Sequence, residues 1–413
     1  MRFSLVVRLA GRNLARNLRR TVLSVVGVGV GCAIAVFLWS FSRGANEFRV
    51  RGVAESGIGH LAIVPETWID TRDPDIRLAN WREELSRARS HEGVVAATPT
   101  ATTSALLAFG TRVVGVEMLG VDPVAEPKVS RIARAIGEGR YLDASDDGAV
   151  VVGREVVEQL DVELGDELYV TVVEVTGDIE YVMLEIVGII DTGSKTLDAS
   201  LCHVTLDELS RITGRDGPTK IAIMVDDIRS IDEITAELSA DASFGNTVIT
   251  WKTLVPAMGA DADADDVFNN TLVGTIILVV MLGVTSARLT AVLERKREFA
   301  VLLALGMKPM QILRLIMLEA FVVGTAGSVV GLVLATPLVY LLATKGLSFT
   351  DSFGSDSSIA GVLFDPVIYG DMGAWMVPVA FIVGIVSTLA AAVYPTVSAV
   401  RTDPTSALTM REG

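Results

Sequence analysis

Four long apolar segments constrain this chain more than any other feature of its sequence. They cover residues 21–41, 271–293, 312–342 and 375–394, and the first and last carry no charged side chain. A helix needs about 20 residues to cross the roughly 30 Å of hydrocarbon in a bilayer. Half of the 413 residues are hydrophobic, and the mean hydropathy is +0.49. The sequence therefore predicts four transmembrane helices, and the first is too long for a cleaved secretory signal.

The basic residues orient these helices. Residues 1–20 hold six arginines and no acid, the link at 294–311 adds four basic residues, and the tail at 395–413 adds two. All three segments fall on one side if the helices alternate, and the positive-inside rule makes that side the cytoplasm. We therefore expect a multi-pass protein of the inner (cytoplasmic) membrane with both termini in the cytoplasm.

Residues 42–270 then form one large extracytoplasmic domain. They carry 41 Asp or Glu against 20 Lys or Arg, so nucleic acid is an improbable partner and the charge favours solubility. A shorter extracytoplasmic loop is expected at 343–374.

The pattern within the large domain is mixed α and β. Strands are expected at His60–Val64 and Thr111–Val121, and a helix after Asn80, with Glu83 completing a capping box. Residues 148–175 read as strand, helix, turn and strand, and Tyr181–Ile190 returns after a turn at 176–178 as a hairpin. A further helix is predicted at 231–240, and the acidic run at 259–266 is interpreted as a solvated linker.

The sequence contains few motifs that would indicate a disulfide, a metal site or a catalytic site. Cys32 lies in the first span and Cys202 outside, so they cannot pair, and the three histidines are far apart in sequence and interpreted as structural. We expect no metal site, no catalytic residues and no cofactor in this chain. It carries no Gly-rich loop ending in Lys-Ser or Lys-Thr that would bind ATP phosphates.

Two cytoplasmic segments are amphipathic or apolar without spanning. Residues 1–20 predict an interfacial helix, with an apolar stripe opposite its arginines. Within 294–311, the stretch Glu298–Gly306 is too short to span and too apolar for water, and Pro309 suits the start of the next helix. This stretch either docks into a groove on a soluble partner or lies on the lipid interface; its periodicity leaves both open.

Three stretches are distinctive: ERKREFAVLLALGMKPMQILRLIMLEAFVVGTAGSVVGLVLATP (Glu294–Pro337), VYPTVSAVRTDPTSAL (Val393–Leu408) and RLAGRNLARNLRRTVLSVVGVGVG (Arg8–Gly31). They resemble ABC transporter permeases of the MacB, LolC/LolE and FtsX type. Within that family, SGIGHLAI (Ser56–Ile63) and GVDPVAE (Gly120–Glu126) look closest to the lipoprotein-releasing LolC/LolE branch. The order of one helix, a large outer domain and three helices is also similar. The fold class is thus a membrane protein with four transmembrane helices arranged 1+3 and a mixed α/β extracytoplasmic domain.

The resemblance implies a mechanism and partners. Two permeases, identical or paired with a sister subunit, would join a separate ABC ATPase that binds ATP and Mg. The segment Glu298–Gly306 would contact that ATPase through residues Glu298, Phe299, Leu302, Leu303, Leu305 and Gly306. Lipoprotein or lipid-linked cargo would leave the outer leaflet, with membrane lipid and a periplasmic lipoprotein carrier or an adaptor as further partners.

Two features inside the spans bear on this mechanism. Glu319 is a carboxylate in a hydrophobic segment, where it marks a functional site or pairs with a nearby arginine. Gly27 with Gly31, and Gly327 with Gly331, are spaced for close helix packing. The resemblance implies a cargo cleft between the first and second spans, lined by Gly27, Gly31, Val36, Phe37, Ile276 and Val280.

Two related functions remain open alternatives. A MacB-like efflux permease would need a periplasmic adaptor, and chains of that branch usually carry an N-terminal ATPase that this sequence lacks. An FtsX-like permease would control a cell-wall hydrolase, but usually has a smaller outer domain. The space between Val170 and Val187 holds only a compact hairpin, so we expect no extended hook there for a carrier.

Overall fold

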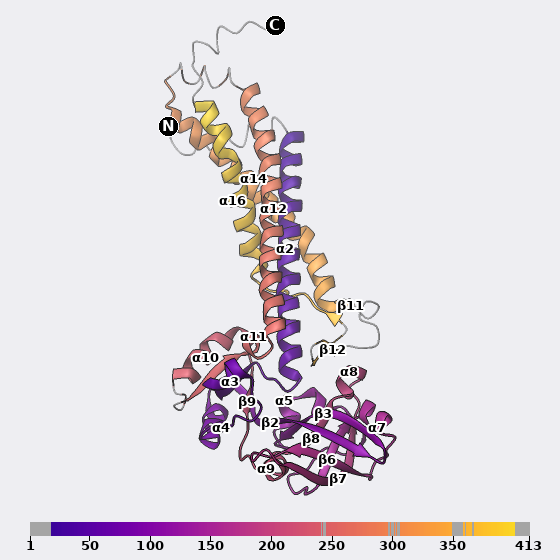
Figure 1. Cartoon of the computed structure of the whole chain (residues 1–413). Helices are drawn as coiled ribbons and strands as arrows, with labels where there is room; N and C mark the ends of the chain where they lie inside the picture. The colour runs from indigo at the N-terminus through magenta and orange to yellow at the C-terminus, as the bar shows by residue number, and fades with distance from the viewer. Residues whose placement is uncertain are drawn as a thin grey trace. The chain divides into compact units, whose positions relative to one another are not determined.

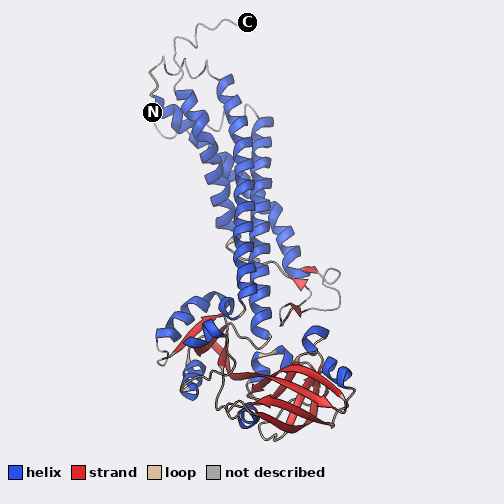
Figure 2. Ribbon diagram, viewed as in Figure 1, coloured by secondary structure: helices blue, strands red, loops and turns tan. Residues whose placement is uncertain are grey.

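The computed structural model describes residues 18–240, 242, 245–295, 298, 301, 303, 306–348, 358–359, 361–365 and 367–400, without the side chains of residues 359 and 398–400. The predicted amphipathic helix at 1–20 and the tail after residue 400 therefore lie almost entirely outside the described residues. The chain divides into a helical unit (residues 1–45, 264–347 and 369–413) and an α/β unit (residues 46–263 and 348–368). Figures 1 and 2 show their elements.

Four long helices dominate the helical unit: α2 (Leu18–Glu55), α12 (Pro256–Glu294), α14 (Pro309–Lys345) and α16 (Met376–Val400). Among the described residues, these four are long and apolar enough to cross a membrane, which confirms the predicted arrangement. They extend well beyond the apolar segments. The acidic run at 259–266 lies inside α12 instead of forming a linker, although its aspartates are exposed as expected.

Glycines bring these helices into close contact. A Cβ atom on Gly327 would lie 2.6 Å from Val28 Cγ1, and one on Gly331 would lie 2.5 Å from Cys32 Cβ, so α14 packs tightly on α2. On α2 the matching glycine is Gly29. Gly31 instead contacts Val280 of α12, where a Cβ would lie 2.4 Å from the valine Cγ2. Gly31 thus makes a close helix contact, as its spacing predicted, whereas Gly27 has no described neighbour within 4 Å.

The α/β unit is built on one sheet with the strand order β10-β1-β9-β2-β3-β8-β5-β7-β4, and β6 pairs with β2 and β7. The strands are β1 (Leu61–Pro65), β2 (Val94–Phe109), β3 (Arg112–Val121), β4 (Ile136–Gly139), β5 (Ala149–Gly153), β6 (Glu167–Val173), β7 (Ile179–Ile190), β8 (Leu201–Thr205), β9 (Lys220–Val225) and β10 (Asn246–Thr250). Its helices are α3 (Glu66–Thr71), α4 (Trp81–Ser90), α5 (Glu126–Val129), α6 (Arg131–Arg134), α7 (Arg154–Leu160), α8 (Lys195–Asp198), α9 (Leu206–Thr213), α10 (Ile231–Ala240) and α11 (Trp251–Leu254), with a 3₁₀ turn at Ile228–Ser230. Short strands lie at Leu347–Ser348, Ser358–Ile359, Val362–Leu363 and Val367–Ile368.

Strand β2 belongs to both halves of this sheet. Its residues 94–100 pair with β9, and residues 100–109 pair with β3. One hydrophobic core, which includes Ile63 and Ile223, packs under the β9 half, and another, which includes Leu107 and Ile186, packs under the β3 half. The 16-residue strand thus joins two separately packed halves.

Most predicted elements of this unit are present. Residues 148–175 form β5, α7 and β6, and β6 returns to β7 through a tight turn at Gly177, whose φ is +87°. Helix α4 begins as predicted after Asn80. However, Asn80 adopts a left-handed conformation with φ +50°, and its side chain makes no capping hydrogen bond, so the predicted capping box was wrong.

The two buried histidines are tied into the fold. The backbone N–H of Val225 donates to His60 Nδ1 at 3.1 Å, and Tyr141 Oη lies 2.9 Å from His203 Nδ1. Burial lowers the pKa of each imidazole to about 4. Cys32 and Cys202 are both buried and free, and among the described residues there is no cluster of three or more His, Cys, Asp or Glu that could hold a metal.

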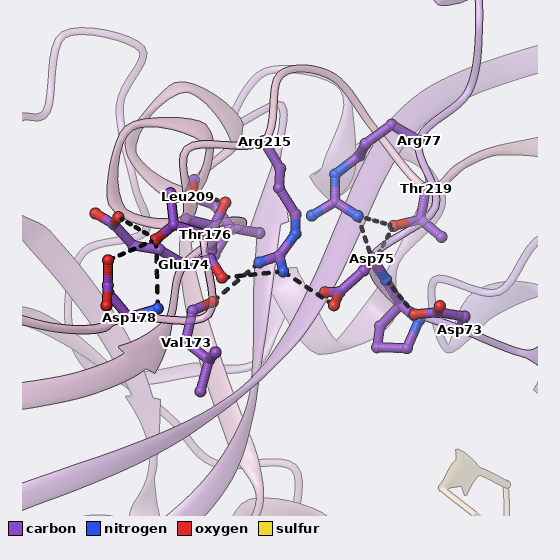
Figure 3. Close-up of polar contacts among 12 residues, drawn as sticks. Asp73, Asp75, Arg77, Val173, Glu174, Thr176, Asp178, Leu209, Arg215 and Thr219 are labelled. Carbon is purple, nitrogen blue, oxygen red and sulfur yellow. Dashed lines mark hydrogen bonds and ion pairs between the residues drawn. The ribbon is translucent and has the colours of Figure 1, made fainter.

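Arg215 links the two halves of the α/β unit, as Figure 3 shows. Its guanidinium donates to the carbonyl oxygens of Val173 (2.9 Å) and Glu174 (3.3 Å) and pairs with Asp75 at 2.9 Å. The side chain is only 9% exposed. Beside it, Arg77 Nη1 donates to Thr219 Oγ1 at 3.2 Å.

We expect Arg215→Ala to lower the free energy of unfolding by about 2 kcal/mol, because hydrogen bonds from a charged donor are lost inside the fold. The matched control is Arg112→Ala, which removes an exposed pair with Asp161 and should cost less than about 0.5 kcal/mol. Chemical denaturation of the purified chain measures both. Equal effects would mean that Arg215 does not hold the halves together.

Glu126 is a second buried polar residue, with no exposed surface. Burial raises the pKa of its carboxyl to about 7, while a hydrogen bond from Thr98 and the charge of Lys220 lower it and Asp122 raises it. Because the folded pKa exceeds the unfolded value, its contribution to stability is complete below about pH 4.5 and is lost as pH rises through about 7.

We expect Glu126→Gln to remove this pH dependence. Relative to the wild type, the variant should gain up to about 3 kcal/mol between pH 4.5 and pH 8. Calorimetric unfolding at several pH values measures the difference, with exposed Glu158→Gln as the control. Parallel pH curves for wild type and Glu126→Gln would contradict the assignment.

Candidate functional site

The link between α12 and α14 is the candidate site for contact with a partner. Its turn is built by local chemistry: Gly306 has a φ of +90°, and its N–H donates to the carbonyl of Leu303 at 3.0 Å. Lys308 is the N-cap of α14, its backbone N–H donates to Gln311 Oε1 at 2.9 Å, and Pro309 takes the first helical position, as predicted.

The described side chains of this link face two ways. Leu303 packs inward against Val292, Ile312 and Ile316. Val301, by contrast, is 45% exposed. At 100° per residue, positions 298 and 301 share one side of a helix and position 303 lies on the other. Three of the predicted contact residues, Phe299, Leu302 and Leu305, lie outside the described residues.

An ion-pair cluster lies under this link. Glu319 of α14 is 3.5 Å from Arg288 Nη1 of α12 and 3.5 Å from Arg295 Nη1, and Arg288 Nη2 donates to the Glu319 carbonyl oxygen at 3.1 Å. Arg295 also donates through Nε to Glu298 at 3.0 Å. The side chains of Glu319, Arg288 and Arg295 are 9%, 11% and 19% exposed. Glu319 is therefore paired inside the bundle, and Arg295, one of its two partners, also contacts the link.

A second ion pair ties the neighbouring helix ends together. Arg20 donates through both terminal nitrogens to Glu294, at 2.9 and 2.8 Å. This bidentate ion pair fixes the start of α2 against the end of α12. Sequence reasoning counted Arg20 only as a positive charge and missed the pair, because 274 positions separate the two residues.

The predicted cargo-cleft residues lie on different surfaces. Val36 is fully buried against α14 and α16, and Phe37 packs beside it. Gly31 and Val280 contact each other between α2 and α12. Ile276 is half-buried, and Gly27 is exposed.

Apolar side chains are exposed elsewhere on the same helices. Val26, Val30 and Ile34 recur every four residues along α2, each more than 40% exposed. On α12 the exposed apolar residues include Leu278, Val279 and Leu282. Each stripe is an apolar surface suited to contact with lipid or another subunit.

Family comparison assigns both parts of the chain. The MacB-like periplasmic core domain matches residues 21–241, and the FtsX-like permease C-terminal domain matches residues 270–404. The chain belongs to the LolC/MacB/FtsX family of ABC transporter permeases. It is accordingly a multi-pass membrane protein, and the resemblance seen in its sequence is confirmed.

Two curated relatives span most of the permease. The lipoprotein-releasing system transmembrane protein LolC of Neisseria meningitidis is 23% identical over 94% of this chain and 93% of its own length. The macrolide export ATP-binding/permease protein MacB of Marinobacter nauticus is 25% identical over 87% of this chain and 57% of its own length. The solved periplasmic region of MacB from Actinobacillus actinomycetemcomitans covers 51% of this chain and 95% of that chain, with 14% identity and a TM-score of 0.36.

Proposed function

We propose that this permease is the membrane subunit of an ATP-driven transporter that releases lipoproteins or lipid-linked cargo from the outer leaflet of the inner membrane. The observation that carries the proposal is the similarity to LolC over nearly the whole of both chains. The ion-paired link between α12 and α14 supports it, since a force applied there would reach both helices through Arg295 and Glu319.

The proposal includes an arrangement in the membrane and a set of partners. Both termini and the α12–α14 link lie in the cytoplasm, and the acidic α/β unit lies outside. ATP and Mg bind a separate ABC ATPase, and this chain carries no catalytic residue or cofactor. A second permease, identical or a sister subunit, completes the transporter.

The contact with the ATPase is made by the exposed side of the link. Glu298 and Val301 lie on this side, whereas Leu303 packs into the bundle and supports the link from within. Leu302 and Leu305, which lie outside the described residues, remain predicted contacts from the sequence alone. An apolar side chain on a short helix suits docking into a groove of a soluble partner.

Acyl chains of the cargo need an apolar surface that is open to the bilayer. The exposed stripes of α2 and α12 supply such a surface. Val36 is buried, so the acyl chains are proposed to contact exposed residues such as Ile34 instead. The second permease would close the cleft from the other side.

Photo-crosslinking tests this proposal with a matched pair of positions. A crosslinker at Ile34 should capture acylated protein in the assembled transporter, and ATP should reduce the yield. A crosslinker at Val36, two residues away and buried, should react within the chain with α14 or α16. Capture of lipid alone at Ile34, with no acylated protein in any state, would contradict lipoprotein release.

Efflux with a periplasmic adaptor is the second candidate, and the similarity to MacB at 25% identity favours it. In that case the Ile34 crosslinker would recover small amphipathic molecules, and the α/β unit would co-purify with an adaptor. Activation of a cell-wall hydrolase by the α/β unit, without transport, would instead indicate FtsX-like signalling.

A further inference from the structure

The α/β unit contains a cavity of about 460 Å³, partly open to its surface, where its two halves meet. Its lining includes Trp68 of α3, Thr100 of β2, Glu117 of β3, Glu126 of α5, Leu201 of β8 and Lys220 of β9. The volume falls in the range of small-molecule sites, about 300–1,000 Å³. The lining combines apolar side chains with a few charged ones, as such sites usually do.

Two polar atoms of this lining are buried without a partner. Glu126 Oε2 accepts a hydrogen bond from Thr98 Oγ1 at 3.1 Å, but Glu126 Oε1 and Thr100 Oγ1 have no hydrogen-bond partner among the described residues. Glu126 is 0% exposed and Thr100 is 1% exposed. Thr98 and Thr100 leave the same face of β2 about 7 Å apart, so Thr100 continues the polar surface that holds the carboxylate.

Such atoms are uncommon in folded proteins, because a buried oxygen without a hydrogen bond loses its hydration without compensation. A ligand group with several N–H donors could donate a hydrogen bond to both the carboxylate oxygen and the hydroxyl oxygen. A primary ammonium group carries three.

Lys220 supplies the opposite charge. It is half-buried in the cavity wall, and no carboxylate of the described residues lies close enough to form an ion pair with it. Glu126 and Glu117 are near enough to raise the pKa of Lys220, although burial, the larger effect, lowers it. The other basic side chain of the lining, Arg72, is already occupied: it donates to the carbonyl oxygens of Leu254 (3.3 Å) and Thr253 and stacks on Trp68.

We propose that this cavity binds a small zwitterion of the amino-acid class, with an apolar side chain. Its ammonium donates to Glu126 Oε1 and Thr100 Oγ1, and its carboxylate accepts from Lys220 Nζ. The side chain packs against the apolar wall near Leu201. This binding site is independent of the transport function proposed above, and each can fail without the other.

Isothermal titration of the full chain in lipid nanodiscs tests the site with L-phenylalanine as the probe. Phenethylammonium lacks the carboxylate of the probe, and 3-phenylpropionate lacks its ammonium. We expect L-phenylalanine to bind one site per chain at least about tenfold more tightly than either compound. Absence of binding at ligand concentrations up to about 10 mM would overturn the proposal, as would equal affinity for all three compounds.

Variants assign the two ends of the ligand. Glu126→Gln and Lys220→Met should each weaken L-phenylalanine binding about tenfold or more. Lys220→Met should weaken phenethylammonium binding much less than it weakens L-phenylalanine binding, whereas a general loss of the cavity would weaken both alike. Glu158→Gln, at an exposed position, should bind as the wild type does.

Thr100→Val keeps the shape of the wall and serves where Glu126→Gln perturbs folding. Thermal unfolding of each variant shows that it remains folded. Wild-type affinity in both Glu126→Gln and Thr100→Val would show that the ammonium does not contact these residues, and would overturn the proposal.

Discussion

The Val301→Asp permease should insert into the membrane but lose ATP-dependent cargo release by about tenfold or more. Val301 is an exposed apolar residue on the link between α12 and α14, and a carboxylate placed there would have to be desolvated in the groove of the ATPase. Co-purification with the ATPase and the rate of ATP hydrolysis measure the effect.

Val124→Asp is the matched control, because Val124 is 63% exposed in the α/β unit and has no proposed contact with the ATPase. It should bind the ATPase normally. If Val301→Asp also binds and releases cargo normally, the link lies on the lipid interface, which is the alternative that its sequence leaves open.

Glu319→Leu should lower the free energy of unfolding by about 3 kcal/mol, because it leaves the buried guanidinium group of Arg288 without its carboxylate and removes one of the two carboxylates that pair with Arg295. Titration of the purified chain with sodium dodecyl sulfate in mixed micelles measures this change. The double variant Arg288→Leu/Glu319→Leu should recover much of the stability, since Arg295 retains Glu298.

The same experiment separates the two interpretations of Glu319. A structural ion pair predicts loss of stability and its recovery in the double variant. Unchanged stability in Glu319→Leu together with lost transport would assign the carboxylate a direct role in function instead.

The architecture could be predicted from local sequence because a bilayer imposes strict rules on length and charge. Apolar segments of at least about 20 residues predicted four helices, and β-branched runs and the turn at Gly177 predicted strands of the α/β unit. The helix boundaries were less accessible. The acidic residues at 259–266 suit solvent equally well in a linker or on an exposed helix, and the structure has the helix.

Contacts between distant residues could not be predicted. Glycine spacing indicated close packing, but Gly27, Gly29 and Gly31 follow one another at every second position, and spacing alone does not say which faces α14. In the same way, the sequence does not distinguish Leu303 from the other apolar residues of the link. Only the structure shows that it packs against Ile312 and Ile316.

The α/β cavity is the clearest case. Glu126 stands in the sequence GVDPVAE as an ordinary acid, and its burial depends on β2 and β9, about 30 and 90 residues away in the sequence. A metal site or a catalytic group is recognised in a sequence by the spacing of several residues, and a lone carboxylate has no such spacing.

The central claim is tested most directly by reconstituting the permease with its ATPase partner in proteoliposomes that contain an acylated lipoprotein. The account predicts that ATP moves the lipoprotein into the soluble fraction when a carrier protein is present, and that a hydrolysis-deficient ATPase does not. ATP-dependent loss of small amphipathic molecules from the vesicles, with the lipoprotein retained in the membrane, would contradict it.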